Sequence, residues 1–313
     1  MAQPSETFDT YDSIGEREDL SDVIYNISPT DTPFLSSAAK TQATAVLHEW
    51  QTDSLAAAVT NNAVIEGDEA TADAVTATTR LSNSSQILDK VVTITGTQEA
   101  VDKAGRASEI AYQIAKKAKE LKRDLESSLT SNNAEVTGGS STARQLGGLG
   151  SWVATNDVFG SGGASGGLGN TARTNGTQRA FTEAQLKSVI KSVWNAGGNP
   201  QIIMVGPFNK QKLSGFTGNS TRFDAGADAT LYTSVDVYAS DFGQTQVIPN
   251  RFSRDRDGWV LDMDYWGVAF LRDFSMHELA KTGDTEKRQL LVECTLESRN
   301  EAASGLIADL TTS

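Results

Sequence analysis

Cysteine and histidine are nearly absent from the chain. Its 313 residues include one cysteine, Cys294, and two histidines, His48 and His277. A single cysteine excludes an internal disulfide and a cysteine-based metal cage, and the histidines do not lie at metal-ligand spacing. We therefore expect no metal site. Both histidines should lie in strands, and Cys294 should be a core residue because its neighbours on the same strand face are apolar.

Long apolar runs are also missing. No stretch approaches the roughly 20 consecutive apolar residues of a membrane-spanning helix. The first residues, MAQPSETFDTYDS, are acidic and polar, unlike a secretory signal. These absences predict a protein that is made and folded in a cytoplasm and has no membrane partner.

Basic residues are scarce at the start of the chain. The whole sequence carries 40 acids and 27 bases, a net charge of −13. Residues 1–80 hold 14 of these acids and three bases, a net −11, which leaves −2 for the remaining 233 residues. A tight nucleic-acid binder usually has a basic face, and none is evident. The acidic stretch predicts a solvated surface.

Catalytic motifs lack the structural context that they require. Gly163–Gly167 matches the G-x-S-x-G pattern of a serine nucleophile, and Gly167–Ala172 matches a loose dinucleotide fingerprint. Both lie in a glycine-rich loop, without the strand and helix that each motif needs. The acidic run 65–73 lacks the ligand spacing of a calcium loop. We expect no catalytic residue, no cofactor and no enzyme activity; a hydrolase using Ser165 with one histidine is the alternative from another class.

Two strand-like runs flank a segment that has no core of its own. AVLHEW (45–50) and QILDKVVTIT (86–95) are rich in β-formers and could pair. Between them, residues 55–79 contain no aromatic or basic side chain, so they bury too little surface to become ordered alone. We predict an extended hairpin or flap. Its apolar side chains are candidates for contact with another subunit: Val59, Val64, Ile65 and Val75.

Helical periodicity is strongest in the middle of the chain. An apolar stripe runs through residues 97–132 and predicts one helix about 50 Å long. Apolar spacing predicts a short helix over 20–27, and Pro33 suits the first turn of another over 33–39. A Gly/Ser-rich tract covers 137–176, where Trp152 and Val153 can anchor the chain.

The remaining sequence mixes one clear helix with strands. Thr182 and Gln185 form a capping-box pattern for a helix over 182–196, and Gly197 suits its C-terminal cap. β-rich runs follow at 199–207, 233–240, 244–249, 258–274 and 288–300. Helices and strands in this order predict an α+β fold.

Several stretches resemble one protein family over nearly the whole chain. They are DLSDVIYNISPTDTPFLSS (19–37), IIMVGPFNKQKLSGF (202–216), GWVLDMDYWGVAFLRDF (258–274) and LAKTGDTEKRQLLVECTLESRNEAASGLIADL (279–310). They resemble the major capsid protein of tailed bacteriophages, which has the Hong Kong 97-type capsid fold. The second and fourth stretches are the most specific.

The resemblance implies a division of the chain along that fold. Residues 1–40 would be the N-terminal arm, and 41–95 an extended β-hairpin loop lying over a neighbouring subunit. Residues 96–136 would hold the spine helix of the peripheral domain. Residues 137–257 would form the axial domain, and 258–313 a β-rich return that completes both domains.

The resemblance also implies a structural role. The chain would self-assemble as hexamers and pentamers into an icosahedral head that encloses double-stranded DNA without sequence-specific binding. Its partners would be itself, a separate scaffolding protein, a portal and a possible decoration protein. It would reside in the virion after assembly in the host bacterial cytoplasm. An encapsulin-type compartment shell and a monomeric decoration or surface protein are the alternatives.

Some members of the family join their subunits through an isopeptide bond from a lysine of the extended loop. In this sequence, Lys40 and Lys90 flank the loop, and no lysine lies within 41–89. We therefore predict that this chain forms no such crosslink.

Overall fold

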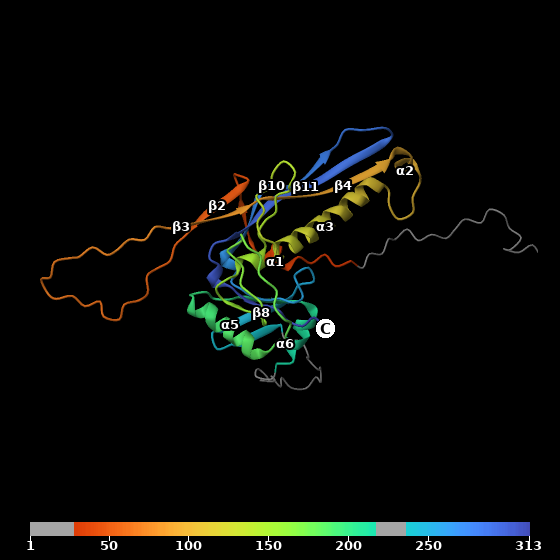
Figure 1. Cartoon of the computed structure of the whole chain (residues 1–313). Coiled ribbons are helices and arrows are strands. Elements are labelled where there is room, and N and C mark those ends of the chain that lie inside the picture. The colour runs from red at the N-terminus through yellow and green to blue at the C-terminus, as the bar shows by residue number, and fades with distance from the viewer. Residues whose placement is uncertain (1–27, 217–235) are drawn as a thin grey trace, which may run out of the picture.

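The computed structural model describes residues 28–216 and 236–313, which form helices and three β-sheets (Figure 1). This confirms the α+β prediction. The helix predicted over 20–27 lies outside the described residues. A body of two sheets carries a long loop that projects on one side, while a helix and the end of one sheet extend on the other side (Figure 1). Within the described ranges, no helix is long and apolar enough to cross a membrane.

The first sheet has four strands and forms the extended part of the body. Its spatial order is β1 (Ala39–Gln42), β10 (Trp266–Glu278), β11 (Thr285–Ser298) and β4 (Gln86–Thr95). β1 runs parallel to β10, and the other two pairings are antiparallel. β10 and β11 make a long hairpin, and Cys294 lies within it, fully buried. Burial raises the pKa of this thiol to about 12, so Cys294 is an inert core residue, as predicted.

The helix along this sheet is shorter than the sequence predicts. Instead of one helix over 97–132, the chain forms α2 (Gly96–Ala100) and α3 (Glu109–Leu129). Gly105 adopts a positive φ of 76° between them, and the Ser108 hydroxyl caps α3 by accepting the Ala111 N–H. The 21 residues of α3 span about 32 Å. Its apolar stripe is fully buried only in the C-terminal half.

A buried carboxylate fixes the start of the described chain against α3. The Glu126 side chain accepts the backbone N–H groups of Phe34 and Leu35, each at 2.8 Å. These residues belong to α1 (Pro33–Ser37), the short helix predicted from Pro33. Asn250 donates a third bond at 2.7 Å. Burial raises the pKa of Glu126, and these three donors oppose that shift.

The second sheet has six strands and carries two helices. Its order is β5 (Asp157–Val158), β12 (Gly305–Ile307), β9 (Gly258–Leu261), β6 (Ile202–Val205), β8 (Gly243–Pro249) and β7 (Val237–Ser240). The helices are α5 (Glu183–Asn195) and α6 (Pro207–Ser214). The capping box of Thr182 and Gln185 forms as predicted, and Gly197 adopts a φ of 91° after the helix. The segment after residue 257 contributes strands to both sheets.

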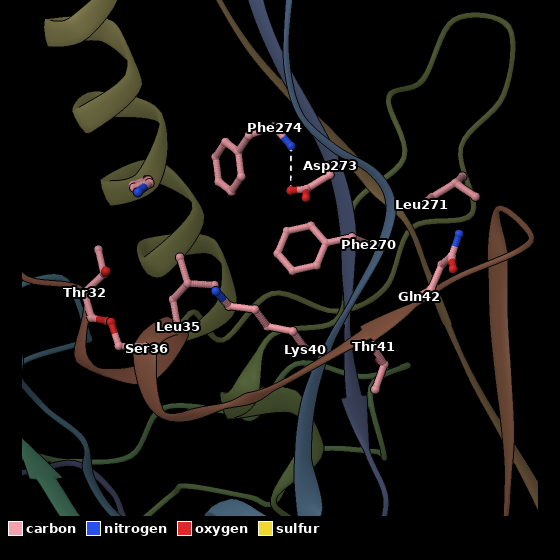
Figure 2. Close-up of a pocket in the computed structure, with 11 residues that line it drawn as sticks. Thr32, Leu35, Ser36, Lys40, Thr41, Gln42, Phe270, Leu271, Asp273 and Phe274 are labelled. Carbon is pink, nitrogen blue, oxygen red and sulfur yellow. Dashed lines mark hydrogen bonds between the residues drawn. The ribbon is translucent and has the colours of Figure 1, made fainter.

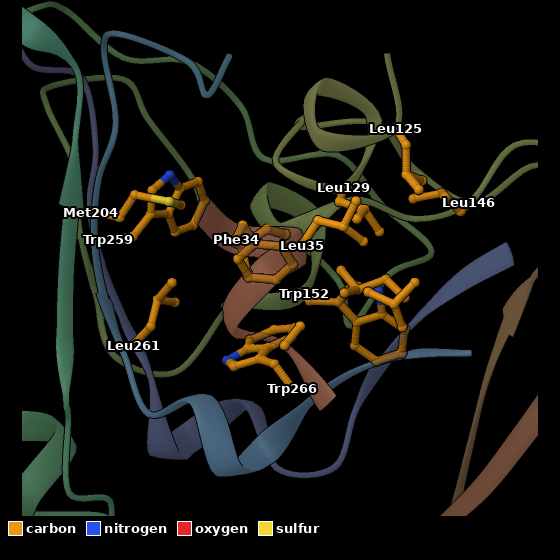
Figure 3. Packing of buried hydrophobic residues seen from close by; sticks show 14 of the residues in the cluster. Phe34, Leu35, Leu125, Leu129, Leu146, Trp152, Met204, Trp259, Leu261 and Trp266 are labelled. Carbon is orange, nitrogen blue, oxygen red and sulfur yellow. The ribbon is translucent and has the colours of Figure 1, made fainter. Parts of the chain in front are cut away.

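Aromatic side chains fill the core between the two sheets (Figure 3). Trp152, Trp259 and Trp266 are fully buried there, and the Phe34 ring meets Trp266 edge-on at 6.3 Å. Trp152 belongs to α4 (Leu149–Trp152), in the middle of the Gly/Ser-rich tract. The predicted anchoring of that tract by Trp152 and Val153 is therefore confirmed. Two 3₁₀ turns, Met263–Tyr265 and Glu301–Ala303, complete the C-terminal segment.

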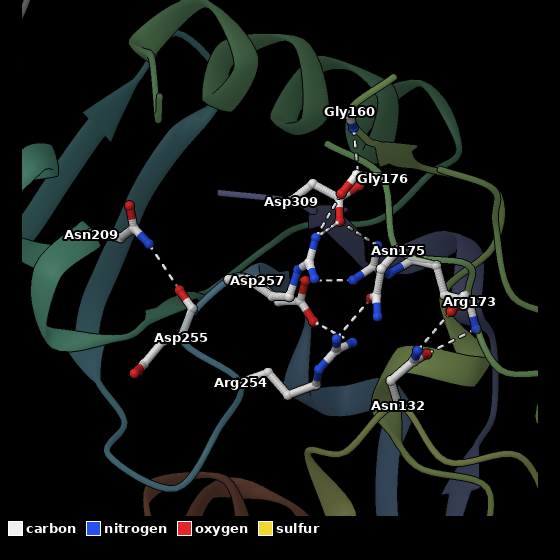
Figure 4. A network of polar contacts seen from close by, with 11 residues as sticks. Asn132, Gly160, Arg173, Asn175, Gly176, Asn209, Arg254, Asp255, Asp257 and Asp309 are labelled. Atoms are coloured by element: carbon white, nitrogen blue, oxygen red, sulfur yellow. Dashed lines mark hydrogen bonds and ion pairs between the residues drawn. The ribbon is translucent and has the colours of Figure 1, made fainter. Parts of the chain in front are cut away.

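Charged side chains hold the same tract to the C-terminal segment (Figure 4). The Arg173 side chain is fully buried; it lies 2.6 Å from Asp257 and 3.3 Å from Asp309. Arg254 and Arg256 approach the same two carboxylates from the outside, at 3.0 and 2.7 Å. The tract is thereby joined to two segments that are distant in sequence.

The two strands expected to pair around the loop do not pair with each other. β2 (Leu47–Thr52) pairs with β3 (Thr79–Ser84), and β4 pairs with β11 instead. At Ser85 the chain passes from one sheet to the other, and its hydroxyl donates to Glu293 of β11 at 3.0 Å. The apolar face of β4 requires a long partner over a core, which β11 supplies and the six-residue β2 cannot.

Candidate assembly surfaces

Among the residues that the structure describes, the most exposed apolar side chains lie in the extended loop, residues 53–78. The loop has neither helix nor strand, and its side chains are exposed throughout. The four residues singled out from the sequence are between 73% and 96% exposed: Val59, Val64, Ile65 and Val75. The fold brings none of them into its own core. Leu55, 99% exposed, belongs to the same set and was missed; it is the first apolar residue beyond β2.

Tryptophan packing holds the root of this loop, the β2–β3 ladder, against the body. The Trp50 Nε1–H donates to the Ser298 carbonyl at 2.7 Å. Its ring lies 5.4 Å from that of the buried Trp152. The loop therefore starts from a strand that is fixed to both the end of β11 and the Gly/Ser-rich tract.

Polar side chains of β3 provide a second attachment. The Asn83 amide is fully buried; it donates to the carbonyls of Gly147 and Leu296 and accepts the Gly147 N–H. Ser84 donates to Glu135 at 2.6 Å. These bonds satisfy polar groups that would otherwise be buried without partners. The exposed loop thus has a well-ordered base.

Glu297 of β11 gathers polar groups from several elements at the same place. It accepts the Thr41 hydroxyl at 3.0 Å and the Arg299 Nε–H at 3.1 Å. Nε2 of His48, a residue of β2, lies 3.5 Å from Oε2 of the same Glu297 carboxylate. His48 together with Arg299 and Thr41 lowers the pKa of Glu297 to about 2, against the opposing effect of burial.

The two histidines occupy strands, as predicted, in different settings. His277 lies on the exposed part of β10, where its Nε2 is 3.1 Å from the Ser275 hydroxyl. His48 is half-buried, and its Nε2 faces Oε2 of Glu297 at 3.5 Å, which is longer than an ordinary hydrogen bond. Its ring lies 5.6 Å from that of Trp50. Of the two, only His48 is placed at a junction between elements.

A groove of about 590 Å³ lies between α1, β1, β10 and α3 (Figure 2). Leu35, Phe270 and Phe274 give it an apolar wall, and Lys40 and Lys122 stand at its sides. β1 pairs with β10 only as far as Phe270. Beyond that point, no strand in the described part of the chain pairs with this side of β10. The groove therefore combines apolar surface with an open sheet edge.

The structure also places the residues that a metal site or a serine nucleophile would need. In residues 28–216 and 236–313, no group of three or more His, Cys, Asp or Glu side chains is placed to hold a metal ion. Ser165, the serine of the G-x-S-x-G match, hydrogen-bonds the Asp157 carboxylate. It lies between β5 and α5, without the strand-to-helix turn that positions a serine nucleophile.

Comparison with known proteins identifies the family. The model of the SU10 major capsid protein family matches residues 3–311. The chain belongs to this family. This major capsid protein is also 30% identical, over 345 aligned positions, to the major capsid protein of Escherichia phage Phieco32. The match covers 98% of the chain and 97% of that relative. The protein is a structural component of a tailed-phage virion.

Solved structures confirm the Hong Kong 97-type capsid fold. The capsid asymmetric unit of Cyanophage A-1(L) superposes with a TM-score of 0.67 at 13% identity, covering 97% of this capsid protein and 98% of that chain. The SrpI encapsulin of Synechococcus elongatus PCC 7942 gives a TM-score of 0.54, also at 13% identity, over 96% and 94% of the two chains. The fold is thus common to phage heads and encapsulins, and the family match decides in favour of the phage capsid protein.

Proposed function

We propose that this protein assembles as hexamers and pentamers into an icosahedral head around double-stranded DNA, with the extended loop of each copy lying over a neighbouring copy. The observation that carries the proposal is the loop itself. Its valines and isoleucine are almost fully exposed, although its root is firmly attached. Exposed apolar side chains gathered on one projection favour burial against a partner.

The groove beside α3 is the acceptor that we propose for the loop of the neighbouring copy. The loop carries only acidic charge, from Asp53 to Asp73. The groove presents Lys40 and Lys122 beside its apolar wall, with Asp273 as the one opposing charge among its lining residues. The complementary charges favour encounter and register between copies.

This contact would be made head to tail. The loop projects on one side of the body, whereas α3 and the end of the first sheet extend on the other (Figure 1). A loop that reaches the α3 side of the next copy joins two different surfaces. Such a heterologous contact generates rings when its rotation closes. Five- and six-membered rings then differ in the rotation at this contact, which a loop without helix or strand can accommodate.

We assign the parts of the fold as the family resemblance implies. Residues 1–40 are the arm, 41–95 the extended loop with its flanking strands, and 96–136 the spine segment. Residues 137–257 form the axial domain, and 258–313 complete both domains. β10 and β11 belong to the first sheet, and β9 and β12 belong to the second. This division supports the assignment of residues 258–313 to both domains.

The remaining functional assignments are also proposals. The protein has no enzyme activity. A separate scaffolding protein, a portal and a decoration protein complete the head. The head assembles in the host cytoplasm. No isopeptide crosslink forms from the loop. Lys90 lies 2.5 Å from Asp124 of α3, which holds its amine on the body. Boiled, reduced particles should therefore run as a single band near 33.3 kDa on denaturing gels; a covalent ladder would contradict this assignment.

Deleting residues 55–79 tests the central proposal. Because the loop contributes nothing to its own core, the variant should fold with an unchanged melting temperature but form no closed shells. Negative-stain imaging and sedimentation, with and without scaffold, measure the outcome. A matched variant with Val59, Val64, Ile65 and Val75 replaced by serine keeps the loop length and removes only its apolar groups.

The two variants separate the possible outcomes. Loss of shells in both identifies the apolar side chains as the contact. Normal particles from the deletion would contradict the role of the loop between subunits. If the wild-type chain itself stays a monomer at all concentrations, even with scaffold, the shell proposal fails.

A further inference from the structure

The Gly/Ser-rich tract contains a dipeptide that is prone to a covalent rearrangement. Asn175 is followed by Gly176, and this is the one Asn-Gly pair in the sequence. The glycine nitrogen of such a pair is unhindered by a side chain, and its closeness to the asparagine carboxamide allows the two groups to close a five-membered ring. Asn175 is exposed, and residues 175–178 belong to neither helix nor strand. Water therefore reaches the pair, and no ladder holds its backbone.

The fold places a donor against the carboxamide of this pair and an acceptor against its nitrogen (Figure 4). Nη2 of Arg254 donates to Oδ1 of Asn175 at 2.8 Å. The backbone N–H of Gly176 donates to the carboxylate of the buried Asp309. Nη2 of Arg256 donates to the Gly176 carbonyl at 2.8 Å and keeps the glycine in this place.

Close packing explains why a glycine stands at position 176. A Cβ there would come within 2.6 Å of the Gly160 carbonyl oxygen and 2.8 Å of Oδ2 of Asp309. A residue with a side chain therefore does not fit while the backbone N–H stays against the carboxylate. The contact with Asp309 and the Asn-Gly pair thus follow from the same packing.

We propose that Asn175 is a site of self-deamidation, in which Arg254 polarises the carboxamide and Asp309 takes up the proton of the Gly176 nitrogen. That nitrogen attacks Cγ of Asn175, and a cyclic imide forms. The proton passes through Asp309 to Nδ2, the Cγ–Nδ2 bond breaks, and the nitrogen leaves as ammonia. Water then opens the imide at either carbonyl and leaves aspartate or isoaspartate at position 175. Overall, one water molecule is consumed and one ammonia is released.

Each partner supplies a group that an unfolded chain lacks. The negative charge that develops on Oδ1 of Asn175 faces the Arg254 guanidinium, which is the arrangement that stabilises an oxyanion. The proton acceptor is ionised: burial opposes it, but backbone N–H groups and the Arg173 guanidinium hold the pKa of Asp309 below its usual value. A carboxylate already bonded to the N–H that loses its proton meets the geometric condition for a general base.

The product changes the charge of the network that joins the tract to the C-terminal segment. The ion pairs of this network connect three arginines with two carboxylates, Asp257 and Asp309. Conversion of Asn175 adds a third carboxylate beside Arg254. The reaction therefore moves the network towards charge balance. It takes place within one chain and does not depend on the proposed function.

Mass spectrometry of the folded, full-length chain, digested at intervals, measures the reaction. Trypsin releases residues 174–179, TNGTQR, and deamidation makes this fragment one dalton heavier. A synthetic peptide of the same six residues, kept at the same pH and temperature, gives the rate without the fold. We expect Asn175 of the folded chain to react at least about 10-fold faster than the peptide. Asn170, exposed in the same tract but followed by threonine, should keep its amide.

Two variants test the contact with the carboxamide. Arg254→Gln removes the guanidinium from Oδ1 and should slow the conversion at least about 10-fold. Arg272→Gln, which removes an arginine paired with Glu293 instead, should leave the rate unchanged.

The outcomes are distinct. A rate in the folded chain at or below that of the peptide overturns the proposal, as does equal conversion of Asn170. An unchanged rate in Arg254→Gln overturns the role of Arg254. If Arg254→Gln fails to fold, the comparison of the parent chain with the peptide still decides. Shell formation is measured separately, so failure of this proposal leaves the capsid proposal intact.

Discussion

The extended loop and the Gly/Ser-rich tract look alike in sequence and behave in opposite ways. Both are poor in large apolar residues and long for segments without regular structure. Residues 53–78 stay exposed throughout, whereas 137–176 wrap around Trp152 and become part of the core region. Composition alone does not distinguish them.

The difference lies in partners supplied by distant segments. The tract contains Arg173, whose guanidinium is matched by Asp257 and Asp309, and Asn132 exchanges two hydrogen bonds with the Arg173 backbone. The loop has only acids, and no base of its own chain reaches them within the described residues. A polar segment folds onto the body when its buried polar groups find partners, and otherwise remains available to another chain.

Breaking the Arg173 network should have the largest effect. Arg173→Ala leaves two buried carboxylates with fewer partners, so we expect it to lower the free energy of unfolding by about 3–5 kcal/mol. Arg80→Ala is the matched control, since its pair with Glu49 is exposed and should be worth less than about 1 kcal/mol. Urea titration of both variants measures the difference. Equal losses would show that the tract does not depend on its buried charges.

A pair of glycines sharpens the comparison next. Gly169 in the tract and Gly67 in the loop both have positive φ, 90° and 83°. A Cβ at Gly169 would come within 2.7 Å of the Trp152 ring, whereas at Gly67 it would meet nothing. We expect Gly169→Ala to cost about 2–3 kcal/mol and Gly67→Ala to leave global stability within about 0.5 kcal/mol. Thermal unfolding of the two variants tests this, and a similar loss in both would assign the cost to φ alone.

The boundary between loop and body should respond to acid. Because the folded pKa of Glu297 is about 2, against an ordinary 4.5, its contribution is present above the ordinary value and is lost as the pH falls towards 2. Acidification should therefore lower the free energy of unfolding less in Glu297→Gln than in the parent. The difference between the two losses should be about 2 kcal/mol at most. Denaturant midpoints between about pH 5 and about pH 2 give the comparison. Parallel curves would contradict this role for Glu297.

The smallest effect on stability is expected in the loop. Serine at Val59, Val64, Ile65 and Val75 should change the free energy of unfolding of the unassembled chain by less than about 0.5 kcal/mol, because these side chains bury nothing within it. The melting temperature of the unassembled protein is the measurement. A loss comparable to that of Arg173→Ala would show that the loop packs on its own body.

Local signals in the sequence predicted much of the second sheet and its helices. The capping box at Thr182, the cap at Gly197 and the helix that begins at Pro33 all depend on neighbouring residues and are confirmed. The helix over 97–132 was wrong because a continuous apolar stripe outweighed two local signals, Gly105 and Ser108, that end and restart it.

Features that depend on distant partners could not be predicted in this way. The polar β3 does not look like a strand, since Asn83 and Ser84 are stabilised by groups more than 50 residues away. The same is true of Arg173, and of the meeting of His48 with Glu297, 249 positions apart in sequence. The exposed state of the loop was predictable, because a segment with no basic or aromatic residue has little to bury. Whether its valines contact a second copy stays a prediction.

The lack of basic residues in the loop has a consequence for proteolysis. Trypsin-like proteases cleave after lysine or arginine, and none occurs between Lys40 and Arg80. The most accessible stretch of the described chain is therefore resistant to this whole class of enzyme, while Glu66 and Glu69 leave it open to a glutamate-specific one. A free subunit can thus project 26 residues into a protease-containing medium without being cut by trypsin. The fraction of subunits that the glutamate-specific enzyme cleaves would report how many loops are covered by a neighbouring copy.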